Sequence, residues 1–382
     1  MLRFLHELLT SQAAARPEQL AICWKEERIP YGEVDRLTNQ LAQTLRAHGC
    51  QPGDRVAVLI PNSPNALFAV LGILKAGCVA VPLDLATPAP QLAKLLDDSR
   101  PSAILAARAA RPVLDELFAN HSLGQPASAV VSIGTLEALP IVGDRFATSF
   151  SGLDVLQQSA EPLVSHTTIN SPALLFARSI EFASDVSDAS RSPIFEATMI
   201  APVTSPPTIV THAEVLAFLK NFHEKMPLNE FDRVASLPLQ SPLAVAMTFA
   251  ALAAGAELHL IPPELLARPK PLAAFVRSQE LTDWLTNHGL LSELAGSGTI
   301  CDGDFPSLKR LLWTGEPLPA ATLQDLMQRL PLTHFLRATQ PANSKLSGQS
   351  LIAEQLCEPE TIPALPPVLE PLSVGYTASV GS

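Results

Sequence analysis

The stretch that decides the fold is Leu74–Asp84, LKAGCVAVPLD, in which a leucine-rich helical pattern ends at Gly77 and a short apolar run follows. The run Val79–Leu83 has the length and the flanking glycine of a buried strand. A second apolar run precedes it at Arg55–Ile60 (RVAVLI) and a third follows at Ser102–Ala106 (SAILA), with helical spacing between neighbouring runs. Strand, helix and strand repeated in this way predict a parallel sheet covered by helices.

The helices of this first part carry recognisable end signals. Leucines recur at i and i+4 through Asp35–His48, and Gly49 follows where a helix C-terminal glycine is common. Asn62 or Ser63 can cap the next helix, and Pro90–Ser99 is a third helical segment.

The alternation weakens in the middle of the chain and then returns. One strand is expected at Ala127–Ile133, and the segment 178–205 is rich in Ser, Asp and Pro, which predicts an irregular, mobile and partly exposed insertion. Further helices are expected at His212–Lys225, Ala244–Ala254 and Ala320–Arg329, and further strands at Glu257–Ile261, Leu308–Trp313 and Leu332–Leu336. Residues 1–340 are therefore expected to form one domain, and 341–382, rich in Pro, Ser and Glu, an extended tail or a truncated continuation.

Composition and charge exclude several classes of protein. Of the 382 residues, 47% are hydrophobic, and the formal net charge of −11 includes no Lys/Arg block that would suit a nucleic acid or an anionic membrane. The five cysteines never occur in C-x-x-C spacing, so neither a disulfide framework nor a metal site is expected. The first residues meet a charge too early for a signal peptide, and apolar runs are interrupted before membrane-spanning length. We expect a cytoplasmic protein with no nucleic-acid or membrane partner.

Several segments in collinear order carry a family resemblance. These are Leu5–Leu8 (LHEL), Ile29–Val34 (IPYGEV), Asp54–Val58 (DRVAV), Leu74–Asp84 and Leu311–Pro319 (LLWTGEPLP). Together they resemble the adenylate-forming (AMP-binding) superfamily, most closely the adenylation domains of nonribosomal peptide synthetases. The resemblance spans about residues 5–340 and implies an α/β fold of stacked sheets with covering helices, as in the large N-terminal part of these enzymes. The small C-terminal domain of the family, with its hinge aspartate and catalytic lysine, has no counterpart in this sequence.

A glycine-free window falls where the family binds ATP. Between Gly152 and Gly255 lie 102 residues without glycine, where average usage would give roughly seven. The family's phosphate loop, a Ser/Thr/Gly run ending in P-K-G, corresponds by resemblance to Thr204–His212 (TSPPTIVTH). Pro207 then stands in place of the lysine and Thr208 in place of the final glycine. Because proline lacks the N–H group that phosphate binding requires, this loop is expected not to bind ATP phosphates as its relatives do.

Two further family positions differ in chemistry. Counting back from Gly255, the aspartate that holds a substrate's α-amino group in amino-acid-activating relatives falls on Pro242, which cannot pair with an ammonium. The family's Y-G-P-T-E segment corresponds to Thr339–Asn343 (TQPAN), so that neutral Asn343 replaces the glutamate that helps to hold Mg²⁺. No catalytic residue and no metal ligand is predicted.

The resemblance leaves a vestigial nucleotide pocket as the candidate site. Its residues would be Gly315, Glu316 and Pro317, with Thr204 and Ser205 from the altered loop. The same Gly315–Pro317 segment can instead be the turn that ends the strand at Leu308–Trp313, and both interpretations stay open.

Two other polar features have ordinary interpretations. His212 can cap or line the pocket, although a histidine on the surface or behind the pocket is expected. Asp97 and Asp98 are expected on the solvated face of a helix.

Three functions are compatible with this pattern. The leading hypothesis is a catalytically inactive adenylation-domain-like protein, kept as a scaffold or interaction module beside a carrier protein or synthetase of peptide or polyketide biosynthesis, with no cofactor. The second is a binding module with a residual acyl, aryl or nucleotide pocket. The third is a divergent ATP-dependent and Mg²⁺-dependent ligase completed by a separate C-terminal domain.

Overall fold

Two seven-stranded sheets form the frame of the computed structural model, which describes residues 4–120, 132–137, 148–164, 167–176 and 208–338. Sheet A has the order β14-β13-β12-β10-β11-β1-β2 and sheet B the order β7-β6-β5-β3-β4-β8-β9. Both are parallel apart from the antiparallel pairs β1/β2 and β8/β9.

The strands of the two sheets come from different parts of the chain. Sheet A contains β1 (Leu20–Trp24), β2 (Glu27–Pro30), β10 (Arg233–Ala235), β11 (Glu257–His259), β12 (Asp283–Asn287), β13 (Arg310–Thr314) and β14 (His334–Ala338). Sheet B contains β3 (Arg55–Leu59), β4 (Val79–Pro82), β5 (Ala103–Ala106), β6 (Ser132–Gly134), β7 (Thr148–Phe150), β8 (Pro172–Phe176) and β9 (Thr208–Thr211). Sheet B is thus built from a segment inserted between the first hairpin and the rest of sheet A.

Continuous apolar strands feed different cores because successive side chains point to opposite faces of a sheet. In β3, Val56 and Val58 enter the central core between the sheets, whereas Ala57 and Leu59 enter the core on the outer face of sheet B. In β13, Leu312 joins the central core and Leu311 joins a third core on the outer face of sheet A. Strands buried on both faces read as unbroken apolar runs, which is the pattern of the sequence.

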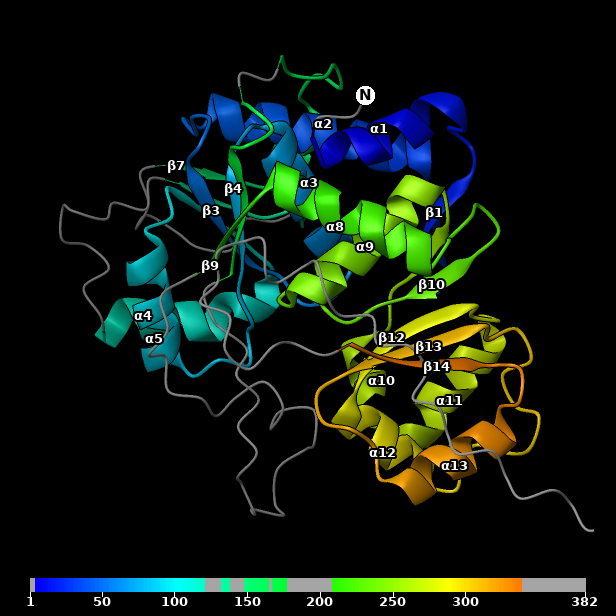
Figure 1. The fold of residues 1–382 in the computed structure, drawn as a ribbon. Helices are drawn as coiled ribbons and strands as arrows, with labels where there is room; N and C mark the ends of the chain where they lie inside the picture. Colours follow the sequence, from blue (N-terminus) through cyan, green and yellow to red (C-terminus); the bar gives the residue numbers. More distant parts are fainter. Residues whose placement is uncertain (1–3, 121–131, 138–147, 165–166, 177–207, 339–382) are drawn as a thin grey trace, which may run out of the picture.

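Helices fill the space between the sheets and cover both outer faces (Figure 1). The central layer contains α1 (His6–Ala15), α2 (Tyr31–Ala47), α3 (Pro64–Lys75), α8 (His212–Lys225) and α9 (Pro242–Ala254). The outer face of sheet A is covered by α10 (Pro263–Leu266), α11 (Pro269–Ser278), α12 (His288–Gly296) and α13 (Ala320–Arg329). The outer face of sheet B is covered by α4 (Ala89–Ser99) and α5 (Arg111–Asn120), preceded by the short η1 (Arg108–Ala110), and α6 (Gly152–Leu156) follows β7.

The two central helices α2 and α3 approach closely at one glycine. A Cβ added to Gly72 of α3 would lie 2.7 Å from Cδ2 of Leu41 on α2. Both residues belong to the buried part of the molecule, so a larger side chain at this position has no solvent to move into.

A buried ionic network ties the amino ends of the central strands of sheet A. Asp232 and Asp283 are both fully buried, and the Arg310 guanidinium contacts Asp283 through Nε and lies 3.6 Å from Asp232. Lys309 Nζ donates to Asp232 at 2.6 Å, and the Thr282 hydroxyl donates to Asp283 at 2.7 Å. Burial raises the pKa of the Asp283 carboxyl, and the contact with Arg310 opposes that shift.

The predicted α/β fold of stacked sheets is confirmed. The strand expected at Val79–Leu83 ends one residue early, and the strand expected at Leu308–Trp313 begins two residues later, at Arg310. Asp97 and Asp98 are exposed as expected. The helix predicted to begin near Asp35 begins four residues earlier, at Tyr31.

Part of the predicted organisation falls outside the described residues. This holds for most of the expected strand at Ala127–Ile133, of which Ser132 and Ile133 are seen in β6, for the segment 178–205, and for the tail 341–382. Their expected conformations, and the domain limit at 340, stay predictions.

Candidate functional site

The carboxyl ends of the parallel strands of sheet A meet where ligands bind in open α/β sheets. Gly315, Glu316 and Pro317 follow β13 directly at this edge. Gly315 has a φ of +101°, which side-chain-bearing residues rarely adopt, so this turn requires glycine. The indole N–H of buried Trp313 donates to the Glu316 carbonyl at 3.2 Å, and this hydrogen bond holds the turn.

The contacts of the Gly315–Pro317 segment fit its interpretation as the turn that ends strand β13. Glu316 and Pro317 are exposed, and Leu318 after them is buried in the outer core of sheet A. The turn is anchored on both sides by apolar side chains and needs no ligand to hold its shape. Its role in a nucleotide pocket stays a prediction, as does that of Thr204 and Ser205, which lie outside the described residues.

The residues after the altered loop belong to strand β9. Thr208, in place of the family's loop glycine, is 8% exposed and lies opposite Phe176 in the antiparallel ladder with β8. Its backbone is therefore part of a sheet, and the two residues before it are prolines. By sequence, Pro207 offers no N–H group and Thr208 carries no charge where the family has a lysine and a glycine, so the expectation that this loop does not bind ATP phosphates stays a prediction.

The helix that follows β9 is capped by its own residues. Thr211 and Glu214 form a capping box in which the Glu214 N–H donates to the Thr211 hydroxyl at 3.2 Å and the Thr211 N–H donates to the Glu214 carboxylate at 2.7 Å. An N-terminus satisfied in this way has fewer free donors for an anion.

His212 is buried in the central core, which excludes a position on the surface and leaves a position behind the pocket open. It is 2% exposed, and its Nδ1 accepts a hydrogen bond from the Leu5 N–H at 3.2 Å. Phe4 and His6 meet its ring edge-on. Burial lowers the pKa of His212 to about 4, so the ring is neutral at pH 7. The sequence does not reveal this burial because the partners of His212 lie at the other end of the chain.

The position of the family's substrate aspartate lies at the start of α9. Pro242 is the first residue of that helix, after Ser241 at the N-cap. Proline suits this position because the first N–H of a helix has no intrahelical partner. The residue thus has a structural reason to be proline, and it provides no charge for a substrate ammonium.

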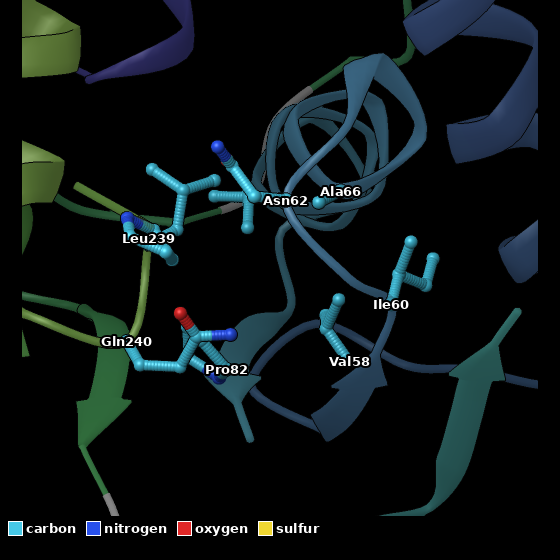
Figure 2. Close-up of a pocket in the computed structure, with 9 residues that line it drawn as sticks. Val58, Ile60, Asn62, Ala66, Pro82, Leu239 and Gln240 are labelled. Atoms are coloured by element: carbon cyan, nitrogen blue, oxygen red, sulfur yellow. The ribbon is translucent and has the colours of Figure 1, made fainter. Parts of the chain in front are cut away.

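A small cleft lies beside this helix start, between the ends of β3 and β4 and the segment 238–240. Figure 2 shows Asn62 just before α3 and Ala66 in its first turn, Val58 and Pro82 from sheet B, and Leu239 on the opposite side. The cleft encloses about 250 Å³, its open mouth included. Its enclosed interior amounts to about 10 Å³, which is room for roughly one water molecule.

The polar side chains of the cleft already have backbone partners. Asn62 donates to the Ile261 carbonyl at 3.0 Å, and Gln240 donates to the Leu83 carbonyl at 3.4 Å. The remaining lining is apolar. The cleft is therefore small, and both of its polar side chains are already hydrogen-bonded within the protein.

This architecture and this set of altered motifs define a class of protein. The family model of the AMP-binding enzymes matches residues 9–163 and 208–337, so the chain belongs to this family. The match is interrupted at 164–207, which includes β8 and the proline pair, and resumes at Thr208.

Similar sequences are nonribosomal peptide synthetases. The chain is 24% identical over 353 residues to surfactin synthase subunit 2 of Bacillus subtilis (strain 168), a match that covers 92% of this chain and 8% of that protein. It is 40% identical over 96 residues to tyrocidine synthase 2 of Brevibacillus parabrevis, a match that covers 25% of this chain and 3% of that protein. The chain therefore spans a small fraction of the relatives it matches.

Solved structures agree on the fold. The nonribosomal peptide synthetase FmoA3 gives a TM-score of 0.68 at 24% identity, covering 88% of this chain and 31% of that one. The N-terminal domain of FACL13 from Mycobacterium tuberculosis gives 0.71 at 17% identity, covering 88% and 76%. Within the described residues, none of the helices is long and apolar enough to cross a membrane.

Proposed function

We propose that this chain is a catalytically inactive adenylation-domain-like module that acts by binding other proteins of a peptide or polyketide assembly line. The observation that carries the proposal is strand β9, which begins at Thr208 directly after Pro206-Pro207 and pairs with β8. Where relatives have a Ser/Thr/Gly run ending in P-K-G around the ATP phosphates, this chain keeps the proline as Pro206 and has Pro207 and Thr208 in place of the lysine and the glycine.

The surrounding residues support the same proposal. Pro242 starts a helix where amino-acid-activating relatives have an aspartate, and the cleft beside it is small and apolar. Losing preorganised contacts to a reacting phosphate costs several kcal/mol of transition-state stabilisation, and each 1.36 kcal/mol is about tenfold in rate. The three cores are nevertheless intact, as expected for a domain retained for its surface rather than its chemistry.

ATP–pyrophosphate exchange tests the proposal. The purified chain is assayed with a panel of amino, aryl and fatty acids, with and without an adenylation C-terminal domain supplied in trans, beside an active adenylation domain. We expect no exchange above a no-protein control. Substrate-dependent exchange would refute the inactive assignment and support the divergent ligase.

Thermal unfolding with ATP and Mg²⁺ separates the remaining alternatives. A ligand at 100 times its Kd adds about 2.7 kcal/mol to the free energy of unfolding, which is easily seen as a rise in Tm. We expect no rise. A rise without exchange would support the binding module with a residual nucleotide pocket.

Binding to a partner is tested directly. Calorimetric titration with purified carrier-protein domains of an assembly line should give a measurable Kd for at least one domain. Absence of binding to carrier domains and to synthetase modules alike would count against the interaction role.

A further inference from the structure

Three possible metal ligands meet on the outer face of sheet A, away from the altered nucleotide site. Cys23 lies on β1, and Glu257 and His259 lie two residues apart on β11. Cys23 and His259 are directly opposite in the parallel ladder, so all three side chains share one face of the sheet. Their ligand atoms lie within 4.8 Å of one another.

The distances fit a tetrahedral zinc ion after small side-chain movements. Nε2 of His259 lies 3.3 Å from Oε2 of Glu257. Zinc bonds of about 2.0–2.2 Å to nitrogen and oxygen, at tetrahedral angles, place two such ligand atoms about 3.4 Å apart. The histidine and the glutamate are therefore already at ligand spacing, and the thiol needs the largest adjustment.

The other ring nitrogen of His259 has the partner usual for a zinc-bound histidine. Nδ1 lies 3.1 Å from Oε1 of Gln279, the residue that follows α11. If Nδ1–H donates to this oxygen, the lone pair of Nε2 faces the carboxylate of Glu257. Two electron pairs facing each other need either a proton or a cation between them.

The cluster is mostly buried, and charged side chains lie beside it. Cys23 and His259 are 3% and 4% exposed, whereas the Glu257 side chain is 27% exposed and opens the cluster to solvent. Arg233 lies 3.9 Å from the Glu257 carboxylate but also forms an ion pair with Glu280. Burial, with Glu257 as the next cause, raises the pKa of the Cys23 thiol to about 11, so a metal must displace its proton.

We propose that Cys23, Glu257 and His259 bind one Zn²⁺ ion, with Gln279 positioning the histidine. A thiol, an imidazole and a carboxylate form a donor set suited to zinc and unsuited to Mg²⁺ or Ca²⁺, which prefer oxygen ligands. The ion would fasten β1, near the start of the chain, to β11 in its second half. Three protein ligands leave a fourth position for water.

Cobalt titration tests the site, because Co²⁺ replaces Zn²⁺ and gives a thiolate charge-transfer absorption band. The full chain is used with Cys301→Ser and Cys357→Ser, which remove an exposed cysteine and one outside the described residues. We expect the band to saturate at one equivalent of Co²⁺ and to vanish when Zn²⁺ is added.

Variants in this background identify the ligands. Cys23→Ser should abolish the thiolate band, and His259→Gln should abolish saturation at one equivalent. Gln279→Ala should weaken Co²⁺ affinity by about 10–100-fold while keeping the band. Cys78→Ser is the matched control, since Cys78 is also buried but lies directly before β4 in sheet B, and it should change nothing.

Two results would overturn the proposal. One is the absence of a saturable Co²⁺ band in the protein that carries only Cys301→Ser and Cys357→Ser. This result refutes the proposal even if the Cys23 or His259 variants do not fold. The other is a band that persists in the Cys23→Ser protein. In either case the cluster is a hydrogen-bonded histidine–carboxylate pair beside a thiol.

Discussion

Replacing Arg310 by methionine should show how strongly sheet A depends on its buried ionic network. Arg310 is the only one of the network's two cations that contacts Asp283, and the aspartate is fully buried. Methionine keeps the apolar stem and removes the guanidinium. Asp232 retains its ion pair with Lys309 at 2.6 Å, so the charge left uncompensated is mainly that of Asp283.

The expected magnitude follows from the burial of the pair. Removing one partner of a buried ion pair costs about 3–5 kcal/mol, because the other charge is left unpaired. The Arg310 side chain is 14% exposed and the Thr282 hydroxyl still donates to Asp283, so the lower end, about 3 kcal/mol, is expected at pH 8. With an m-value of about 3 kcal/mol/M, the urea midpoint should fall by about 1 M.

The loss should shrink as the pH falls. Burial already raises the pKa of Asp283, and without Arg310 that pKa rises further. The folded variant then takes up a proton at a higher pH than the unfolded chain, so acidification favours its folded state. The deficit relative to the wild-type protein should fall by about 1–2 kcal/mol between pH 8 and pH 5, since one pKa unit is about 1.36 kcal/mol.

Urea unfolding of matched variants checks the reasoning. Arg111→Met breaks the exposed pair with Asp115 and should change stability by no more than about 0.5 kcal/mol. Adding Asp283→Asn to Arg310→Met should recover part of the loss, because it removes the buried charge. An Arg310→Met deficit no larger than that of Arg111→Met, or equal at both pH values, would refute the argument.

Two further predictions concern packing and acid stability. Gly72→Ala should destabilise the protein by about 1–3 kcal/mol in chemical denaturation, because the new Cβ meets Leu41 at 2.7 Å. Gly296→Ala is the control, since nothing lies within 4 Å of its Cβ position, and it should not destabilise the protein. Equal effects of the two substitutions would contradict the packing argument. Burial lowers the pKa of His6 to about 3 and of His212 to about 4, so the unfolded chain binds protons first and stability falls as the pH drops below about 6.5. His212→Gln keeps an acceptor for Leu5 and should reduce the loss between pH 7 and pH 5 by about 2 kcal/mol; an unchanged loss would show that His212 is not the titrating group.

Much of the fold could be predicted because its strands are continuous apolar runs bounded by glycine. The runs that begin at Val56 and Val79 are apolar throughout, so their strand assignment does not depend on which face of the sheet a residue occupies. Gly255 ends α9 with a φ of +75°, the conformation expected of a glycine at a helix C-terminus. Helices α11 and α12 were not predicted, and some short strands were missed because they are too brief to show a periodic pattern. The strand Arg233–Ala235 and the strand Glu27–Pro30 are recognisable only through their partners.

The candidate site could be predicted only where a local motif carried it. The turn at Gly315 could be predicted from the sequence because its backbone conformation requires glycine. His212 and Cys23 could not be placed, because the first packs against Phe4 and the second against His259, and no local spacing records such neighbours. The cysteines therefore read as scattered along the chain even though one of them stands beside a histidine in the folded protein.

The insertion of sheet B within sheet A has a consequence for biosynthesis. The β1/β2 hairpin leaves the ribosome before the other strands of the two sheets, and β11, which pairs with the other side of β1, follows only after all of sheet B. During that interval β1 presents an unpaired edge of N–H and C=O groups, the kind of edge that recruits other chains. Sheet B can fold before sheet A is complete, since all strands of sheet B emerge before Arg233. Nascent chains arrested before Glu257 should therefore aggregate through β1 more readily than chains arrested after His259, in which β11 can cover that edge.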